Sequence, residues 1–161
     1  MDAIELLKTQ HDEAKALFRK IEKADEGQKG MLFDELADAL AVHAAIEEKH
    51  FYPATKNART EELLQEAVEE HLSVKRIIAD LLELEPSDPQ FDAKISVLEE
   101  QVEHHVEEEE GELFPKVKKM LSADELEDLG VVMEDTADEL KSEGAPREQV
   151  PAETGSAAPL E

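Results

Sequence analysis

Hydrophobic residues recur every three or four positions along most of this chain, and no stretch alternates with the two-residue period of a β-strand. In the first segment, Ile4, Leu7, Ala14, Phe18 and Ile21 would share one face of a helix. The same spacing continues between breaks that contain glycine or proline. It predicts four long helices, over about residues 2–24, 31–52, 60–84 and 90–120.

A shorter fifth helix is expected to follow. Ser122 and Glu125 form a capping-box sequence, which is typical of a helix start, and the helical pattern ends near Ser142. From Gly144 onward large apolar residues are scarce, so this segment is predicted to be a disordered tail. The fold class is therefore all-α, an up-down-up-down four-helix bundle. The expected divisions are 1–120 for the bundle, 121–143 for an additional helix packed on it, and 144–161 for the tail.

Each long helix carries one histidine at a position where its apolar series lacks a member. These residues are His11, His43, His71 and His105. Short loops imply antiparallel neighbours, and all four histidines lie at similar depths when counted from the tight connections. We therefore expect the four imidazoles to meet in one layer at the middle of the bundle.

A histidine and a glutamate repeat together in the second and fourth helices. The segment HAAIEEKHFYP begins at His43, and HVEEEEGELFP begins at His105; their glutamates at the fifth position are Glu47 and Glu109. Residues four apart project from the same face of a helix, about 6 Å apart along its axis. Each histidine can therefore reach one common site together with its glutamate.

Other polar residues near the repeats are expected outside the layer. Glu48 and Glu110 are rotated by about 100° from the ligand face and are predicted to be solvated, as is His104. His50 and Tyr52 are candidates to contact the ligand residues without binding the metal themselves. For Tyr52 the alternative is that it serves only in packing at the helix end.

Composition limits the classes of function. The 161 residues, enough for one domain, carry 17 Lys+Arg and 42 Asp+Glu, a formal net charge of −25. Such a charge repels nucleic-acid phosphates and anionic lipid, so neither is expected as a partner. The absence of cysteine excludes thiolate metal sites and disulfides. With no signal-like or membrane-spanning segment, we expect a cytoplasmic protein. We also expect a monomer or weak dimer.

A buried layer of imidazoles and carboxylates needs compensating charge. A purely structural polar layer is the alternative to a metal site, but two divalent cations would both balance the two glutamates and bind every imidazole. Mixed nitrogen and oxygen ligands favour iron, with manganese or zinc as substitutes. Ferritin-like bundles are the rival fold, but they repeat ExxH, whereas this chain repeats HxxxE.

The doubled motif resembles that of the hemerythrin-like (HHE cation-binding) proteins over about residues 1–120. The resemblance implies a di-iron centre that binds or reacts with O2, hydrogen peroxide or other small oxygen and nitrogen species. In that pattern His11 and His43 hold one iron, and His71 and His105 hold the other. Glu47 and Glu109 bridge them, and water, hydroxide or oxide completes the site.

One position departs from the oxygen-carrying members of that family. They have a further histidine one turn after the third-helix histidine, where this chain has Lys75. Reversible oxygen carriage is thereby disfavoured, and Lys75 becomes a further candidate to surround the ligands. Three classes of function remain: catalase-like or peroxidase-like decomposition of peroxide, oxygen or redox sensing or reversible oxygen binding without turnover, and iron storage or buffering.

Overall fold

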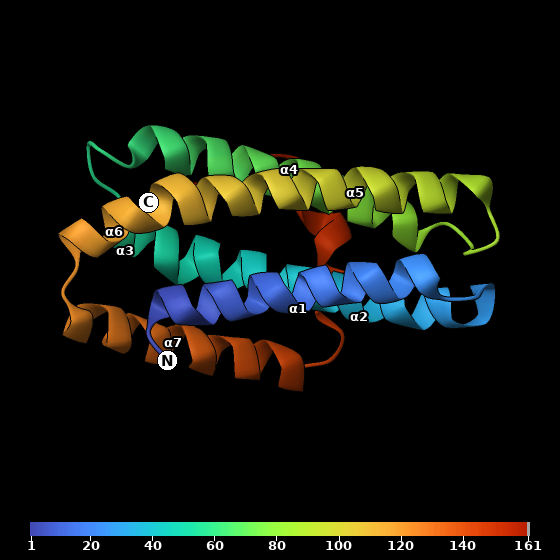
Figure 1. Cartoon of the computed structure of the whole chain (residues 1–161), viewed down its shortest axis with the longest axis horizontal. Helices are drawn as coiled ribbons and strands as arrows, with labels where there is room; N and C mark the ends of the chain where they lie inside the picture. Colours follow the sequence, from blue (N-terminus) through green and yellow to red (C-terminus); the bar gives the residue numbers. More distant parts are fainter. Residues whose placement is uncertain (161) are drawn as a thin grey trace.

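The computed structural model describes residues 1–160, which form an up-and-down helical bundle (Figure 1). Its main helices are α1 (Ala3–Lys23), α2 (Glu26–Ile46), α4 (Glu61–Leu82), α5 (Pro89–Glu108) and α7 (Ala123–Ser142). The short helices α3 (Tyr52–Thr55) and α6 (Phe114–Met120) continue α2 and α5, and a 3-10 helix, η3 (Pro146–Glu153), follows α7. The all-α four-helix bundle is confirmed, with α7 packed against α1 and α2.

Side-chain caps fix where helices begin. Ser122 and Glu125 make the predicted capping box, with N···O distances of 3.1 and 3.0 Å. Asp25 caps α2 by accepting a 3.0 Å hydrogen bond from the Gln28 N–H. This cap starts α2 earlier than predicted, so Gly27 lies inside the helix instead of separating it from α1.

Two π-helical segments, η1 (Glu47–Phe51) and η2 (Glu109–Leu113), were not predicted from the sequence. At their ends the N–H of Tyr52 donates to the Glu47 carbonyl, and that of Phe114 to the Glu109 carbonyl. A proline follows directly in both copies, and because proline has no N–H to donate, the wider turn is favoured there. Each segment adds about one residue to its helix and so rotates later side chains by about 100°.

The hydrophobic core forms two clusters with a polar layer between them. One lies toward the start of α1, the end of α2, the start of α4 and the end of α5; it includes Leu7, Ile46, Phe51, Leu64 and Phe114. The other occupies the opposite half of the bundle and includes Phe18, Leu36, Ile78, Phe91 and Leu98. The apolar halves therefore hold the four helices in the register that places the histidines together.

The prediction of a disordered tail from Gly144 is wrong for the residues that the structure describes. Within it, residues 146–153 form η3, which lies against α2 and α4 (Figure 1). Val150 is 3% exposed in the core, and the Arg147 guanidinium donates to the Asp38 carboxylate at 2.9 Å. Composition alone missed this because one buried valine and a few ion pairs are enough to anchor a short segment.

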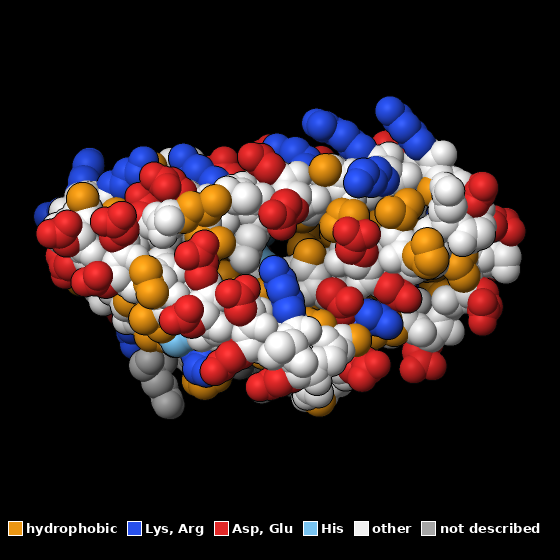
Figure 2. Space-filling model, turned by 90° about the horizontal axis from the view of Figure 1, so that it is seen from below, with side chains coloured by type: hydrophobic (Ala, Val, Ile, Leu, Met, Phe, Trp, Pro, Cys, Tyr) orange, Lys and Arg blue, Asp and Glu red, His pale blue; other side chains and the backbone are white. Residues whose placement is uncertain are grey.

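Acidic side chains are spread over the face shown in Figure 2, as the net charge leads one to expect. Within residues 1–160, no helix combines the length and the apolar character that crossing a membrane requires.

Candidate metal centre

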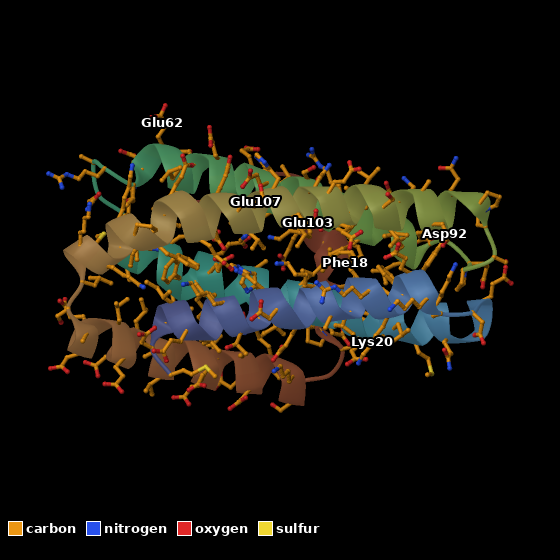
Figure 3. All side chains as sticks on the ribbon, viewed as in Figure 1. Phe18, Lys20, Glu62, Asp92, Glu103 and Glu107 are labelled. Atoms are coloured by element: carbon orange, nitrogen blue, oxygen red, sulfur yellow. The ribbon has the colours of Figure 1, made fainter. Side chains whose placement is uncertain are left out.

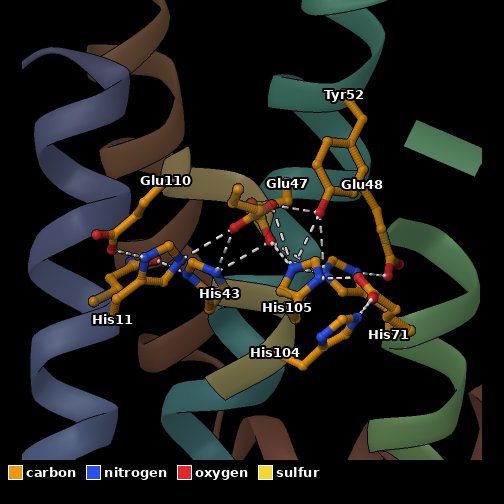
Figure 4. Close-up of polar contacts among 12 residues, drawn as sticks. His11, His43, Glu47, Glu48, Tyr52, His71, His104, His105 and Glu110 are labelled. Atoms are coloured by element: carbon orange, nitrogen blue, oxygen red, sulfur yellow. Dashed lines mark hydrogen bonds and ion pairs between the residues drawn. The ribbon is translucent and has the colours of Figure 1, made fainter. Parts of the chain in front are cut away.

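The six predicted ligands meet in one buried layer, as Figure 4 shows for most of them. Their nitrogen and oxygen atoms form two groups, in each of which the atoms lie within 4.8 Å of one another. The members are His11, His43 and Glu109 in one group, and Glu47, His71 and His105 in the other. The histidines thus pair in space as the resemblance implied.

Glu47 joins the two groups. This side chain is 0% exposed, and its Oε1 lies 3.1 Å from His43 Nε2 in one group and 3.0 Å from His71 Nε2 in the other. The same oxygen lies 3.6 Å from His105 Nε2. A carboxylate in this position can therefore take part in metal binding in both groups.

Glu109 joins the groups through its two separate oxygens. Its Oε1 lies 3.1 Å from His11 Nε2 and 3.9 Å from His43 Nε2, whereas its Oε2 lies 3.3 Å from His105 Nε2. The two glutamates come from equivalent positions, each at the first residue of a π segment. The repeat in the sequence is therefore a repeat in the geometry of the site.

All four imidazoles point Nε2 inward and anchor Nδ1 to an outer acceptor. The distances from Nδ1 to oxygen are 2.6 to 2.7 Å. The acceptors are Glu110 for His11, Gln10 for His43, Glu48 for His71 and Glu70 for His105. An acceptor on Nδ1 fixes the imidazole tautomer and leaves the Nε2 lone pair free to bind a metal.

The prediction that Glu48 and Glu110 are merely solvated is wrong. Each follows a candidate ligand glutamate directly and accepts from an imidazole of another helix. The Glu48 side chain is 13% exposed and that of Glu110 is 37% exposed. The adjacent glutamate pairs in both repeats were the available sequence signal for this role.

Gln10 and Glu70 are further site residues that the sequence did not single out. Both directly precede a candidate ligand, His11 and His71, yet each anchors the imidazole of a different helix. Only the packing between helices reveals these partners, so no spacing within one helix could have predicted them.

Tyr52 reaches the centre of the layer. Its hydroxyl donates to Glu109 Oε2 at 2.7 Å and lies 3.1 Å from His71 Nε2 (Figure 4). In an unbroken α-helix Tyr52 would lie about 180° from His43, and the π segment reduces this angle to about 80°. Tyr52 thus belongs to the site and does not serve only in packing.

His50 does not surround the ligands as predicted. Its Nε2 lies 2.7 Å from the Thr136 hydroxyl on α7. The prediction assumed α-helical spacing from His43, and the π segment turns His50 away from that face.

Lys75 is buried and is linked to the candidate ligand His71 through the side chain of Glu48. Its Nζ makes ion pairs of 3.0 Å with Glu48 and with Glu153 of the C-terminal segment. Since Glu48 also accepts from His71, Lys75 acts on the layer through a carboxylate. The position of the family's additional histidine therefore holds a cation that points to Glu48.

His104, expected at the surface, is 64% exposed there and lies within ion-pair distance of two glutamates. Its Nε2 is 3.0 Å from Glu108 and 3.3 Å from Glu70. Glu70 thus contacts this exposed imidazole with one oxygen and the buried His105 with the other.

Without a metal, the imidazoles and the carboxylates of the layer shift one another's pKa values, so that protonated histidines offset the negative charge of the glutamates. Burial opposes the charged form of His105, but the charge and hydrogen bond of Glu109 outweigh it and hold the His105 pKa well above its usual value. The pKa values of His11 and His71 are raised for the same kind of reason. Burial likewise opposes ionisation of Glu47, yet its imidazole neighbours, led by His43, hold its pKa well below the usual range.

The donor set fits metal ions. His43 Nε2 and Glu47 Oε2 are buried without a hydrogen-bond partner, which is unfavourable unless another group binds them. Ligands about 2.1 Å from one ion at right angles are about 3 Å apart, close to the separations of 3.0 and 3.1 Å at Glu47 Oε1. Imidazole nitrogens and carboxylate oxygens without sulfur suit iron, manganese or zinc.

A cavity of about 40 Å³ lies beside the layer and is reached by all four imidazoles. Its other walls are mainly apolar; they include Leu40, Val74, Ile78, Val102 and Val150. The space suits a molecule as small as water, dioxygen or hydrogen peroxide.

This fold and site define a class of protein, the helical bundles that hold cations between histidines and carboxylates in their core. The chain belongs to the hemerythrin family, because residues 2–117 match the hemerythrin HHE cation-binding domain. All six candidate ligands and all four Nδ1 acceptors lie within the matched residues.

Several known proteins are similar to the chain. An uncharacterized protein of Mycobacterium tuberculosis is 31% identical over 144 residues, which cover 88% of each chain. A crystal structure of a hemerythrin HHE cation-binding domain-containing protein from Mycobacterium kansasii is 29% identical, with a TM-score of 0.79 over 96% of this chain and 94% of that one. A DNA nickase of Nostoc is 27% identical over 128 residues, and the chain matches only 36% of that protein's length.

Proposed function

We propose that this chain is a non-haem di-iron protein of hemerythrin type that decomposes hydrogen peroxide. The observation that carries the proposal is the pair of buried ligand groups, joined by Glu47 and Glu109, with all four imidazoles presenting Nε2 to the interior. Two groups with two shared carboxylates suit two ions. In this assignment His11, His43, His71 and His105 would each hold one ion, and Glu47 and Glu109 would be shared between the two.

The surroundings of the layer favour a small reactant. The cavity of about 40 Å³ admits a molecule of the size of peroxide, and most of its walls apart from the imidazoles are apolar. Iron, when bound, would supply the redox chemistry. The protein would supply orientation, a mainly apolar cavity and fixed protons.

Two protons are held at defined atoms. Tyr52 holds one on its hydroxyl, since burial and the nearby Glu109 charge raise the Tyr52 pKa well above its usual value. His71 holds another on Nδ1 and donates a hydrogen bond from it to Glu48. Lys75 donates to the other oxygen of the same carboxylate. Tyr52 does not line the cavity, so its phenol would act on the layer through its hydrogen bond to Glu109.

Peroxide decomposition is preferred over reversible oxygen binding because of Lys75. Its ammonium pairs with Glu48, so the position that holds an additional histidine in oxygen carriers offers no imidazole to a metal here. Storage without turnover is less well supported, because the two ligand groups are joined and enclosed in the core. DNA nicking, the activity in the name of the Nostoc relative, is not proposed for this chain, because the net charge of −25 opposes DNA binding.

Oxygen evolution tests this function. Iron-loaded protein is expected to consume added hydrogen peroxide and release one dioxygen for every two peroxides, and Glu47→Ala is expected to abolish the reaction together with metal binding. Glu112→Gln, on the exposed side of η2, is the matched control. Iron-loaded protein that binds dioxygen reversibly and leaves peroxide untouched would overturn the proposal in favour of a carrier or sensor.

A further inference from the structure

Two hollows meet on the face of the bundle between α2 and α4. The inner one is the cavity beside the imidazoles, and the outer one, of about 210 Å³, lies between the bundle and the C-terminal strap, residues 144–154. Ala41, Lys75 and Val150 line both hollows. These three residues therefore form the wall between the outer pocket and the candidate metal cavity.

The strap is held over this wall at both of its ends. Gly144, with φ of +131°, turns the chain back after α7 in a conformation that favours glycine. Arg147 then donates to Asp38 of α2 through its guanidinium and its backbone N–H, both at 2.9 Å. At the far end the Thr154 carbonyl accepts from Arg76 of α4 at 3.0 Å.

Val150 is the part of the strap that enters the bundle. It is the buried residue of η3, at 3% exposure, and it packs with the core cluster that contains Phe18 and Ile78. The same side chain lines the cavity. Val150 therefore fills the space between α2 and α4 where those two helices make few direct contacts of their own.

The Glu153–Lys75 ion pair links the strap to the ligand layer. Lys75 Nζ lies 3.0 Å from Glu153 on the strap and 3.0 Å from Glu48 on the bundle. Glu48 in turn accepts from His71 Nδ1 at 2.7 Å. A displaced strap would leave the buried Lys75 with a single carboxylate partner and would open the wall beside His71.

We infer that the C-terminal strap is the gate of the metal cavity, with Val150 as its plug and the Glu153–Lys75 ion pair as its latch. With the strap closed, only molecules small enough for the inner cavity have access from this face. Larger molecules, and the exchange of metal ions, require the strap to open. The part that concerns metal exchange rests on the proposed function, whereas the opening of the strap does not.

A second pocket, on the opposite face, offers the competing route. It lies between α1 and α5, has about 250 Å³, and is lined by Phe18, Glu103 and Glu107, which Figure 3 labels. It shares His11, Val102 and Val106 with the inner cavity, and Val102 and Val106 are the valines of this wall. Val102 is thus the counterpart of Val150 on that side, and the two valines form a matched pair for mutation.

The test uses the full chain as purified and compares Val150→Ala with Val102→Ala. The rate at which bound metal passes to EDTA is followed by metal analysis, since this chelator is too large for the inner cavity. Val150→Ala is expected to raise that rate about tenfold or more, and Val102→Ala to leave it within about twofold. A rate raised by Val102→Ala and not by Val150→Ala would overturn the proposal and place the entrance between α1 and α5.

Hydrogen exchange of the backbone amides in residues 145–154 tests the latch without reference to metal. Glu153→Gln is expected to speed this exchange about threefold to tenfold, as loss of a partly buried ion pair predicts. Glu148→Gln makes the same change of charge on the strap and is the control. Equal exchange in both variants would exclude the latch. Protein without bound metal would refute the proposed function and leave this exchange result interpretable.

Discussion

The hydroxyl of Tyr52 donates a 2.7 Å hydrogen bond to Glu109 Oε2, and the two residues come from the two different copies of the sequence repeat. Phe114 stands at the equivalent position of the second copy, so the site has one phenol and is asymmetric about its two ligand groups. The Tyr52 hydroxyl lies 3.1 and 3.4 Å from the Nε2 atoms of His71 and His105, so of the four imidazoles only the two of that group have a phenol beside them.

Tyr52→Phe should keep the fold and remove this donor. Glu109 Oε2 then loses its hydroxyl donor and keeps only His105 Nε2 at 3.3 Å, so the cost in the metal-free protein should be about 1–3 kcal/mol of unfolding free energy. Chemical denaturation measures that cost. Metal content should be retained while peroxide consumption falls. Unchanged stability and unchanged turnover would mean that the phenol has no part in the site.

The acceptors on Nδ1 should tune metal affinity without being ligands. Gln10→Leu and Glu70→Leu each leave an Nδ1–H without its acceptor, so metal affinity should fall about 10-fold to 100-fold. Competition with a chelator of known affinity measures the change, with the exposed Glu112→Gln as control. Affinities equal to that of the control would show that the acceptors do not orient the imidazoles.

Metal-free and metal-loaded protein should respond to pH in opposite ways. The raised pKa values of His11, His71 and His105 stabilise the metal-free fold below the unfolded-state value of about 6.5, and this contribution is lost as pH rises through the folded-state values. Metal binding needs deprotonated Nε2 atoms, so the loaded form should instead lose metal and stability as pH falls.

Thermal unfolding across this pH range, with and without metal, checks both signs. A metal-free protein that gains stability as pH rises above about 6.5 would contradict the protonated imidazoles of the empty layer.

Lys75→His should move the protein toward oxygen carriage. The substitution supplies the imidazole that oxygen-carrying relatives have one turn after His71 and removes the cation from Glu48. We expect slower peroxide consumption and longer-lived dioxygen binding, followed by optical spectra and oxygen evolution. Lys75→Gln, which removes the charge without adding a ligand, separates the two effects. If both variants behave alike, the added imidazole does not bind metal.

The sequence was sufficient for the bundle and for the histidine layer because both depend on spacing within single helices. His11, for example, stands where the apolar series of its helix has a gap. The two apolar clusters, one on each side of the layer, hold the histidines at the common depth that residue counting predicted. The π segments could not be predicted this way, since an inserted residue breaks the helical period. His50 was misplaced for that reason.

Contacts between helices, and between the bundle and the strap, could not be predicted either, because residue spacing within one helix says nothing about them. Gln10 and Glu70 each anchor a histidine of a different helix, and Val150 packs between two helices far from it in the sequence. Such partners depend on how elements pack, and a single valine in a polar segment carries little pattern of its own.

Metal analysis of protein expressed in iron-replete medium tests the central claim most directly. Two ligand groups joined by Glu47 and Glu109 predict about two irons per chain, lost in Glu47→Ala and Glu109→Ala. Glu112→Gln should retain about two irons. A ratio that stays near one or near zero in the unmodified protein, or iron that survives both glutamate substitutions, would contradict the binuclear centre.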